Sequence, residues 1–514
     1  MKSTRHRNRY RWLIILTCSA VLLVILIGAS FSIYVENEIE ENINSLNGKI
    51  SSIRVNLFAR SIKVKDLEWS SKPTSTNLNP HFLRLSAVTA EGINLYELFF
   101  NKALVINEVT IDSGVVHYTR NVKRSGHKTG SSNYKHFLFK GISLNHIQTH
   151  IKTDTIDSFS AIINGHLRDA SIAIDSLNNL SYSIESVDAL AEKISVSRKE
   201  GMYGGTIARV HVNTRESKIR IDSAELIPNF GKYEFAQHLG KQTARINLSI
   251  PQLTIDGFRL DRLLDSTFVA SKIEINSFHL VAFKDKRIPF LRKENVPLPM
   301  ASFSRLPFDI KVDSVVISNS LITIEEFPEH GIHTGIITFE NIDASIAGLD
   351  NREKEKDHRY ATLRASALLM GTGKIKALFQ LPLDGTSVYT AHGSISNMTF
   401  KELNPILIPM ANVRVESGYL KDLRFDFNYN EYTSKGTINV DYRDLQIISL
   451  NTNKRSTNEI KTFFMNVFVK NERSKSLTPQ QKNGVIDIER DRKRYIFNVW
   501  WKSILDGLKS TILG

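Results

Sequence analysis

The segment that decides the fold is SSIRVNLFARSIKVKDLEW, residues 51–69, in which apolar side chains alternate with polar ones. Ile53, Val55 and Leu57 form one apolar series, and a second series passes through Val64. A period of two residues is typical of a β-strand with one apolar face and one solvated face. The segment therefore predicts two neighbouring strands, and the same pattern recurs along most of the chain.

A longer module occurs twice in the sequence. GINLYELFFNKALVINEVTIDSGVV begins at Gly92, and GFRLDRLLDSTFVASKIEINSFHL begins at Gly257. Both copies combine a glycine, a short helical stretch and an alternating strand that ends in a polar turn. Chance similarity between amphipathic strands is the alternative, but the shared order favours a repeated module. Such repeats predict an array of strand units that bury their apolar faces against one another. The repeated strands contain Val109 and Ile111 in the first copy, and Ile273 and Ile275 in the second.

The run WLIILTCSAVLLVILIGASFSIYV, residues 12–35, carries no charge. Roughly 24 residues in a helix cover the ~30 Å hydrocarbon core of a bilayer. Residues 1–11 are basic and acidic residues follow Val35, so the positive-inside rule predicts a cytoplasmic N-terminal tail and a body across the membrane. Trp12 and Tyr34 would suit the two membrane interfaces. A cleaved signal peptide is the alternative, and the length of the run favours a retained anchor.

Helices are expected only at the ends of the remaining chain and in brief inserts. Residues 36–48 predict a helical stalk because apolar residues recur there at helical spacing before Asn47-Gly48. The C-terminal YIFNVWWKSILDGLKSTILG predicts an amphipathic helix. This helix, with Trp500 and Trp501, could lie in a membrane interface, but capping the last strands of the sheet is the favoured interpretation. The strand-rich body divides into expected β regions at 49–240, 241–390 and 391–514.

Composition excludes several functional classes. Lys plus Arg number 67 against 53 Asp plus Glu, giving a formal charge of +14, yet no nucleic-acid-binding signature accompanies the positive residues. The single cysteine, Cys18, lies in the uncharged run, so the body forms no disulfide. HxxxH at His146 lacks the glutamate of a metallopeptidase motif, and the glycines beside Lys374 lack the spacing of a phosphate loop. The sequence therefore predicts no enzyme, no metal site and no cofactor.

Three features resemble the AsmA-like family of inner-membrane-anchored periplasmic proteins. They are the anchor followed by VNLFARSIKVKDLEW, the module from Gly92, and LNPILIPMANVRVESGYLKDLRFDF with GTINVDYRDLQII behind it. The resemblance implies a mainly β fold, with the transmembrane helix followed by an elongated, twisted antiparallel β-sheet groove. It also implies a single-pass protein of the inner membrane whose bulk lies in the periplasm.

The function implied is non-enzymatic phospholipid binding in an apolar groove, in lipid transport or outer-membrane homeostasis. Expected partners are phospholipid, the inner membrane, and outer-membrane or envelope proteins, with no nucleic acid. An envelope scaffold that binds proteins through sheet edges is the alternative. A slip of one residue in strand phase would turn the groove set outward. The residues expected to line the groove are Ile53, Val55, Leu57, Val109, Ile111, Ile273 and Ile275.

Overall fold

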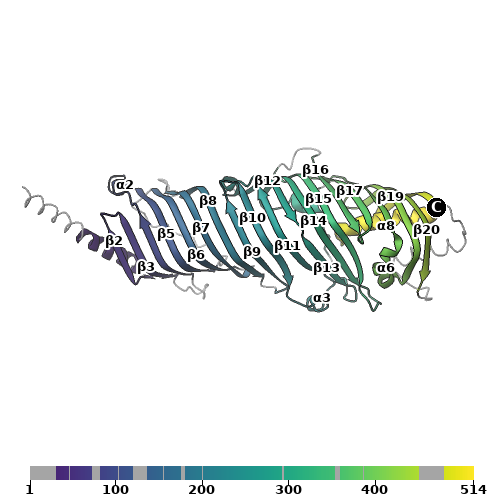
Figure 1. The fold of residues 1–514 in the computed structure, drawn as a ribbon, viewed down its shortest axis with the longest axis horizontal. Helices are drawn as coiled ribbons and strands as arrows, with labels where there is room; N and C mark the ends of the chain where they lie inside the picture. Colours follow the sequence, from purple (N-terminus) through teal and green to yellow (C-terminus); the bar gives the residue numbers. More distant parts are fainter. Residues whose placement is uncertain are drawn as a thin grey trace, which may run out of the picture. The chain divides into compact units, whose positions relative to one another are not determined.

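Strands dominate the protein. The computed structural model describes residues 30–45, 47–71, 81–101, 103–119, 136–153, 156–174, 180–198, 201–264, 266–291, 294–352, 359–385, 387–450 and 480–513. In these ranges the strands form one mixed sheet of 21 strands (Figure 1). The mainly β fold expected from the alternation is confirmed.

The strands follow one another along the chain, with short helices between some of them and a longer helix after the last. The strands are β1 (Gly48–Lys49), β2 (Ser52–Asn56), β3 (Ser61–Ser70), β4 (Phe82–Glu91), β5 (Ala103–Thr119), β6 (His136–Lys152), β7 (Ile156–Ile174), β8 (Leu180–Arg198), β9 (Tyr203–Asn213), β10 (Lys218–Pro228), β11 (Arg245–Asp256), β12 (Thr267–Asn276), β13 (His279–Asp285), β14 (Asp309–Phe327), β15 (Gly335–Asp350), β16 (Tyr360–Leu369), β17 (Gly373–Pro382), β18 (Tyr389–Thr399), β19 (Val413–Tyr429), β20 (Thr433–Ser449) and β21 (Gln480–Glu489). The helices are α2 (Leu95–Phe100), α3 (Glu234–Leu239), α4 (Leu260–Leu264), α5 (Pro299–Phe303), the 3-10 helix η1 (Phe400–Leu403), α6 (Asn404–Ala411) and α8 (Ile496–Leu513).

A further helix covers residues 30–45 and leads into β1. Within the ranges given above, no helix is long and apolar enough to cross a membrane. Residues 1–29, which contain Trp12 and most of the predicted anchor at 12–35, lie outside the described residues.

The chain divides into two compact units. Unit 1 comprises residues 1–199 with 209–215, and unit 2 comprises residues 200–208 with 216–514. The region boundaries predicted after residues 240 and 390 stay predictions.

Strand pairing is mostly antiparallel, but the expectation of a wholly antiparallel sheet was wrong. In unit 1, β5 and β6 run parallel. In unit 2, β14 runs parallel to both β12 and β13. Parallel neighbours need a connection that returns the chain to the end at which the first strand began, and helix α5 lies in the connection between β13 and β14. The sequence pattern does not separate the two orientations, because apolar alternation is the same in both.

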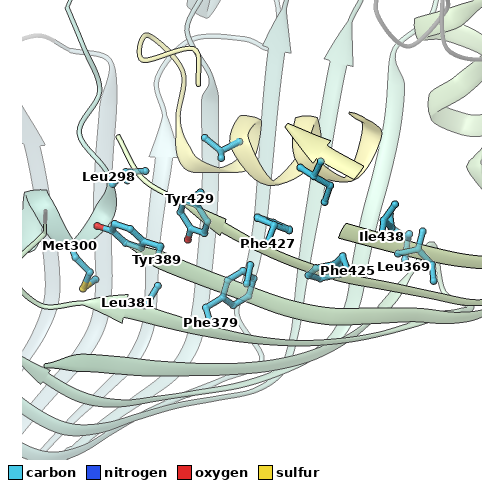
Figure 2. Packing of buried hydrophobic residues seen from close by; sticks show 14 of the residues in the cluster. Leu298, Met300, Leu369, Phe379, Leu381, Tyr389, Phe425, Phe427, Tyr429 and Ile438 are labelled. Carbon is cyan, nitrogen blue, oxygen red and sulfur yellow. The ribbon is translucent and has the colours of Figure 1, made fainter. Parts of the chain in front are cut away.

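The best-packed core lies in unit 2, where α8 and α5 cover one face of strands β16–β21. Figure 2 shows the buried apolar side chains of this core, among them Tyr389, Phe427 and Ile438, between the strands and α8. The Tyr389 and Tyr429 rings stack at 5.0 Å, and Trp500 stacks on Phe379 at 4.5 Å. Burial raises the pKa of both tyrosine hydroxyls well above the ordinary value, so these rings stay neutral. The C-terminal helix therefore packs on the sheet, in the arrangement that the sequence favoured.

Candidate functional site

Apolar residues form continuous rows across unit 1. Ile111 on β5 pairs with Val88 on β4 and with Leu144 on β6. Residues paired directly across a ladder point to the same face, so each such chain of partners marks one row on the sheet. One row runs through Ile53, Val64, Val88, Ile111, Leu144, Gly165 and Ala189, and its neighbour through Val55, Ile62, Ala90, Val109, Ile142, Leu167 and Val187.

Unit 2 carries the same arrangement over more strands. Ile273 on β12 pairs with Ile255 on β11 and with Val315 on β14. The row through Ile273 comprises Ile219, Ile255, Ile273, Val315, Ile346, Leu363, Phe379, Ala391, Phe427, Gly436 and Ile486. The row through Ile275 comprises Ile221, Leu253, Ile275, Ile317, Ala344, Ala365, Ala377, Gly393, Phe425, Ile438 and Gly484.

The exposure of these side chains changes along the rows of unit 2. Ile273, Val315 and Leu363 are only half-buried. Phe427 and Ile486 further along are 1% exposed, because α8 covers them. The apolar face is thus closed by a helix at its C-terminal end and only partly shielded over β10–β16. In unit 1 the rows through Ile111 and Val109 are also half-buried throughout.

Residues in left-handed conformation keep the apolar face on one side of long strands. Ser113 on β5 has φ 52°, and His146 on β6 has φ 54°. Asn319 on β14 has φ 47°, and the ladder with β15 shifts register beside it. His146 and Asn319 each add one residue relative to the next strand, as in a β-bulge, because the β6–β7 and β14–β15 ladders shift register there. Ser113 lies opposite His146, and the ladders of β5 with β4 and β6 stay in register. On both strands the next buried residue follows at a spacing of three, Gly114 after Ile111 and Ile147 after Leu144.

The opposite face of unit 1 is polar. Ser143 donates to Glu108 at 2.7 Å and contacts His166 Nδ1 at 3.0 Å. These three residue types occur in hydrolases, but there the serine hydroxyl donates to the histidine, which the carboxylate orients. Here the serine donates to the carboxylate, and the His166 and Glu108 side chains are 37% and 35% exposed. The arrangement is a surface hydrogen-bond network.

No other chemistry emerges from the described part of the chain. Within it, no group of three or more histidine, cysteine, aspartate or glutamate residues is placed to hold a metal ion. One shallow depression lies beside Asn319 and Glu340 on β14 and β15, and another lies beside Glu91 and Glu108 on β4 and β5.

The structure brings together four of the expected groove residues of unit 1, because Ile53, Val55, Val109 and Ile111 lie in the two adjacent rows. Leu57 lies in the turn after β2 and is half-buried. In unit 2, Ile273 and Ile275 share β12 and lie in adjacent rows.

The expected interface residues differ in their surroundings. Tyr34 is 61% exposed on the helix of residues 30–45, and Trp501 is 44% exposed on α8. Trp500 instead packs on Phe379 in the core, so of this tryptophan pair only Trp501 presents a free aromatic face.

Sequence reasoning missed the C-terminal part of the rows. Phe379, Phe425 and Phe427 belong to the same face as Ile273 and Ile275. Their signal was present in the alternation of GKIKALFQLPL and LRFDFNY. What the alternation does not give is the order of strand partners that joins these segments to β12.

Comparison with known proteins identifies no relative. No protein-family model matches the chain, and no curated protein matches it significantly.

Proposed function

We propose that this protein is a non-enzymatic, membrane-anchored carrier whose apolar face holds the acyl chains of phospholipids. The role is lipid transport or outer-membrane homeostasis, exerted from the inner membrane with the body in the periplasm. The observation that carries the proposal is the unbroken apolar row of unit 2 through Ile275, whose residues are half-buried from β10 to β16. The sequence resemblance to the AsmA-like family and the uncharged run at residues 12–35 support the same reading.

The energetics favour an acyl chain as the occupant of this face. Each methylene group exposed to water costs about 0.8 kcal/mol, and an apolar surface removes most of that cost. Strands are spaced about 4.8 Å apart, so a row that crosses successive strands is an extended track. An acyl chain can move from the row residues of one strand to those of the next without entering water, because the row residues of neighbouring strands are all apolar.

The alternative function, a scaffold that binds proteins by strand addition, has less support. In unit 1 the Val55 N–H on β2 donates to the Glu36 carboxylate at 2.5 Å. In unit 2 the Val485 N–H on β21 donates to Ser510 at 2.7 Å, and the Asp487 N–H to Asp506 at 3.0 Å. These side chains occupy backbone donors that an added strand would need.

A photo-crosslinking experiment tests the lipid proposal. The full chain is produced in a membrane-containing host with a benzophenone amino acid at Ile273, on the apolar face, or at Glu274, on the opposite face. We expect phospholipid adducts, identified by mass spectrometry, at position 273 and not at position 274. Equal labelling at both positions, or none at either, would contradict the proposal.

Charge substitution provides a second readout. Ile111→Asp and Ile275→Asp place a carboxylate in the rows, whereas Thr110→Asp and Asn276→Asp place it on the neighbouring polar positions. We expect co-purifying phospholipid to fall several-fold in the first pair only, with the circular dichroism of all four variants unchanged. Envelope proteins co-purifying in place of lipid would support the scaffold function instead.

A further inference from the structure

A cluster of exposed aromatic side chains lies on the short helix α2 of unit 1. Tyr96 is 64% exposed, Phe99 59% and Phe100 74%. The Tyr96 and Phe100 rings lie 5.0 Å apart. Three neighbouring aromatic residues on a six-residue helix are unusual in contact with water, and such patches mark interaction surfaces.

Local contacts hold α2 in a defined conformation. The Asn94 side chain caps the helix by accepting from the Tyr96 and Glu97 N–H groups at 3.1 and 3.2 Å. Gly92 precedes it with φ 68°, and Ile93 is buried, at 6% exposure. The aromatic residues are therefore displayed by a fixed element.

The second copy of the module provides an internal comparison. Gly257 also has φ 68°, Phe258 is 3% exposed in place of Ile93, and α4 follows. At the position of Tyr96 this copy has Asp261, and it has no aromatic residue on the helix. The fold of the module therefore does not require the aromatic cluster, which belongs only to the copy near the N-terminus.

The β2–β3 turn extends the cluster towards the N-terminal helix. Phe58 in this turn is 64% exposed, and the neighbouring Arg60 carbonyl accepts from the Ile93 N–H at 3.1 Å. In the helix of residues 30–45, Ile43 contacts Gly48, which pairs with Trp69 at the far end of β3. Glu36 contacts Val55, close to the turn. Going towards its N-terminus, this helix therefore runs from the end of β3 at Trp69 towards the strand end at Val55, which is the end of the strands that carries the β2–β3 turn and α2.

The exposed side chains of the same helix change from apolar to polar near Glu36. Phe31, Ile33 and Tyr34 are 40%, 58% and 61% exposed, whereas from Glu36 onward its exposed residues are mainly acidic and amide side chains. The uncharged run of residues 12–35 thus ends next to Glu36, which contacts the end of β2 that leads into the turn.

We propose that Phe58, Tyr96, Phe99 and Phe100 dock this end of unit 1 on the surface of the phospholipid bilayer that holds residues 12–35. Aromatic side chains are favoured at the headgroup level of a membrane, where their rings contact the acyl boundary. The inference rests on the proposed anchor and adds a second, peripheral contact that fixes which end of the strands faces the membrane.

Nitroxide labels test the contact in the full chain reconstituted into phosphatidylethanolamine and phosphatidylglycerol vesicles. The native Cys18 is labelled first and reports on the anchor. In a Cys18→Ser background, labels at Phe58→Cys and Phe100→Cys report on the docking surface. Tyr118→Cys is the matched control, because Tyr118 is an aromatic residue, 44% exposed, at the opposite end of β5 from α2.

We expect the labels at 58 and 100 to collide with oxygen several-fold more, relative to a water-soluble nickel complex, than the label at 118. A water-like ratio at 58 and 100, with the Cys18 label in the bilayer, would overturn the docking contact and leave the anchor standing. A water-like ratio at Cys18 would overturn both. Neither outcome depends on lipid in the rows, so failure of the lipid-carrier function remains distinguishable.

Discussion

At the scale of single residues, left-handed conformations decide which face each side chain joins. Ser113, His146 and Asn319 have positive φ and are not glycine. Serine, histidine and asparagine accept this conformation at moderate cost, whereas β-branched residues do not. Pairs of polar residues such as Asp112-Ser113 and Asn145-His146 therefore have a structural role inside the strands. In the sequence, these pairs resemble turns.

Substitution of Ser113 tests this role. We expect Ser113→Val to lower the free energy of unfolding by about 1–2 kcal/mol, because valine is strained at positive φ. Ser113→Gly should leave stability unchanged or slightly raised. Chemical denaturation followed by circular dichroism measures both, with Thr110→Val on the same strand as control. Equal effects of valine at 110 and 113 would contradict the role assigned to Ser113.

A buried carboxylate at the end of β13 predicts a defined pH dependence. The Arg287 guanidinium donates to Asp285 at 3.0 and 2.7 Å, and this holds the pKa of the Asp285 carboxyl below its ordinary value against the opposing effect of burial. A lowered carboxyl pKa stabilises the fold above its unfolded-state value, near 4, and the contribution is lost as the pH falls through the folded-state value.

We expect Asp285→Asn to reduce stability at pH 7 by about 1.5–3 kcal/mol, the range for hydrogen bonds to charged groups. The difference from the native chain should shrink as the pH falls below about 4. Asp261→Asn is the control, since Asp261 makes the same pairing with Arg259 on the exposed surface and should leave stability unchanged. A difference that does not vary with pH would refute the assignment.

At the scale of elements, α8 packs through small residues. Val499, Ser503 and Gly507 recur at intervals of four along its buried side, and Ser503 pairs with Ser434 at 2.7 Å. A Cβ at Gly507 would approach Ile438 Cγ2 to 2.6 Å, so the glycine permits the close contact. Trp501 is 44% exposed, because the small residues and not this tryptophan define the contact with the sheet.

Gly507→Val should therefore displace α8 and lower stability by about 1–3 kcal/mol, the usual cost of overpacking. Hydrogen exchange should accelerate in α8 and at the β21 edge, where Ser510 and Asp506 accept from backbone donors. Trp501→Ala, on the exposed side of α8, is the control and should change neither measurement. Unaltered exchange in Gly507→Val would show that the contact does not hold the helix.

The repeated module shows which features of an element the sequence predicts. The glycine, the short helix and the following strand were predicted in both copies and are confirmed as Gly92 with α2 and β5, and Gly257 with α4 and β12. The parallel partner that follows each copy was not predicted, because pairing direction depends on a connection outside the module.

At the scale of the whole molecule, each unit carries apolar rows that cross its ladder, in unit 1 from β2 to β8 and in unit 2 from β10 to β21, where the rows pass from β12 directly to β14. A protein that only needed a core would cover such a face, as α8 and α5 do over the last strands. Over β10–β16 the row residues other than Ile255 stay half-buried instead, and the lipid-carrier proposal assigns them an occupant.

By itself, the sequence determined the strand-rich fold, the repeated module, the C-terminal helix and the apolar face of individual strands, since each depends on local periodicity. The tertiary structure decided the order and direction of strand partners, the mid-strand bulges that keep the rows in phase, and the end of the face that α8 closes. These depend on contacts between residues far apart in the chain, such as Ser434 with Ser503. The aromatic residues of α2 depend on both: the sequence gives their identity, but only the tertiary structure shows that they are exposed while the preceding Ile93 is buried.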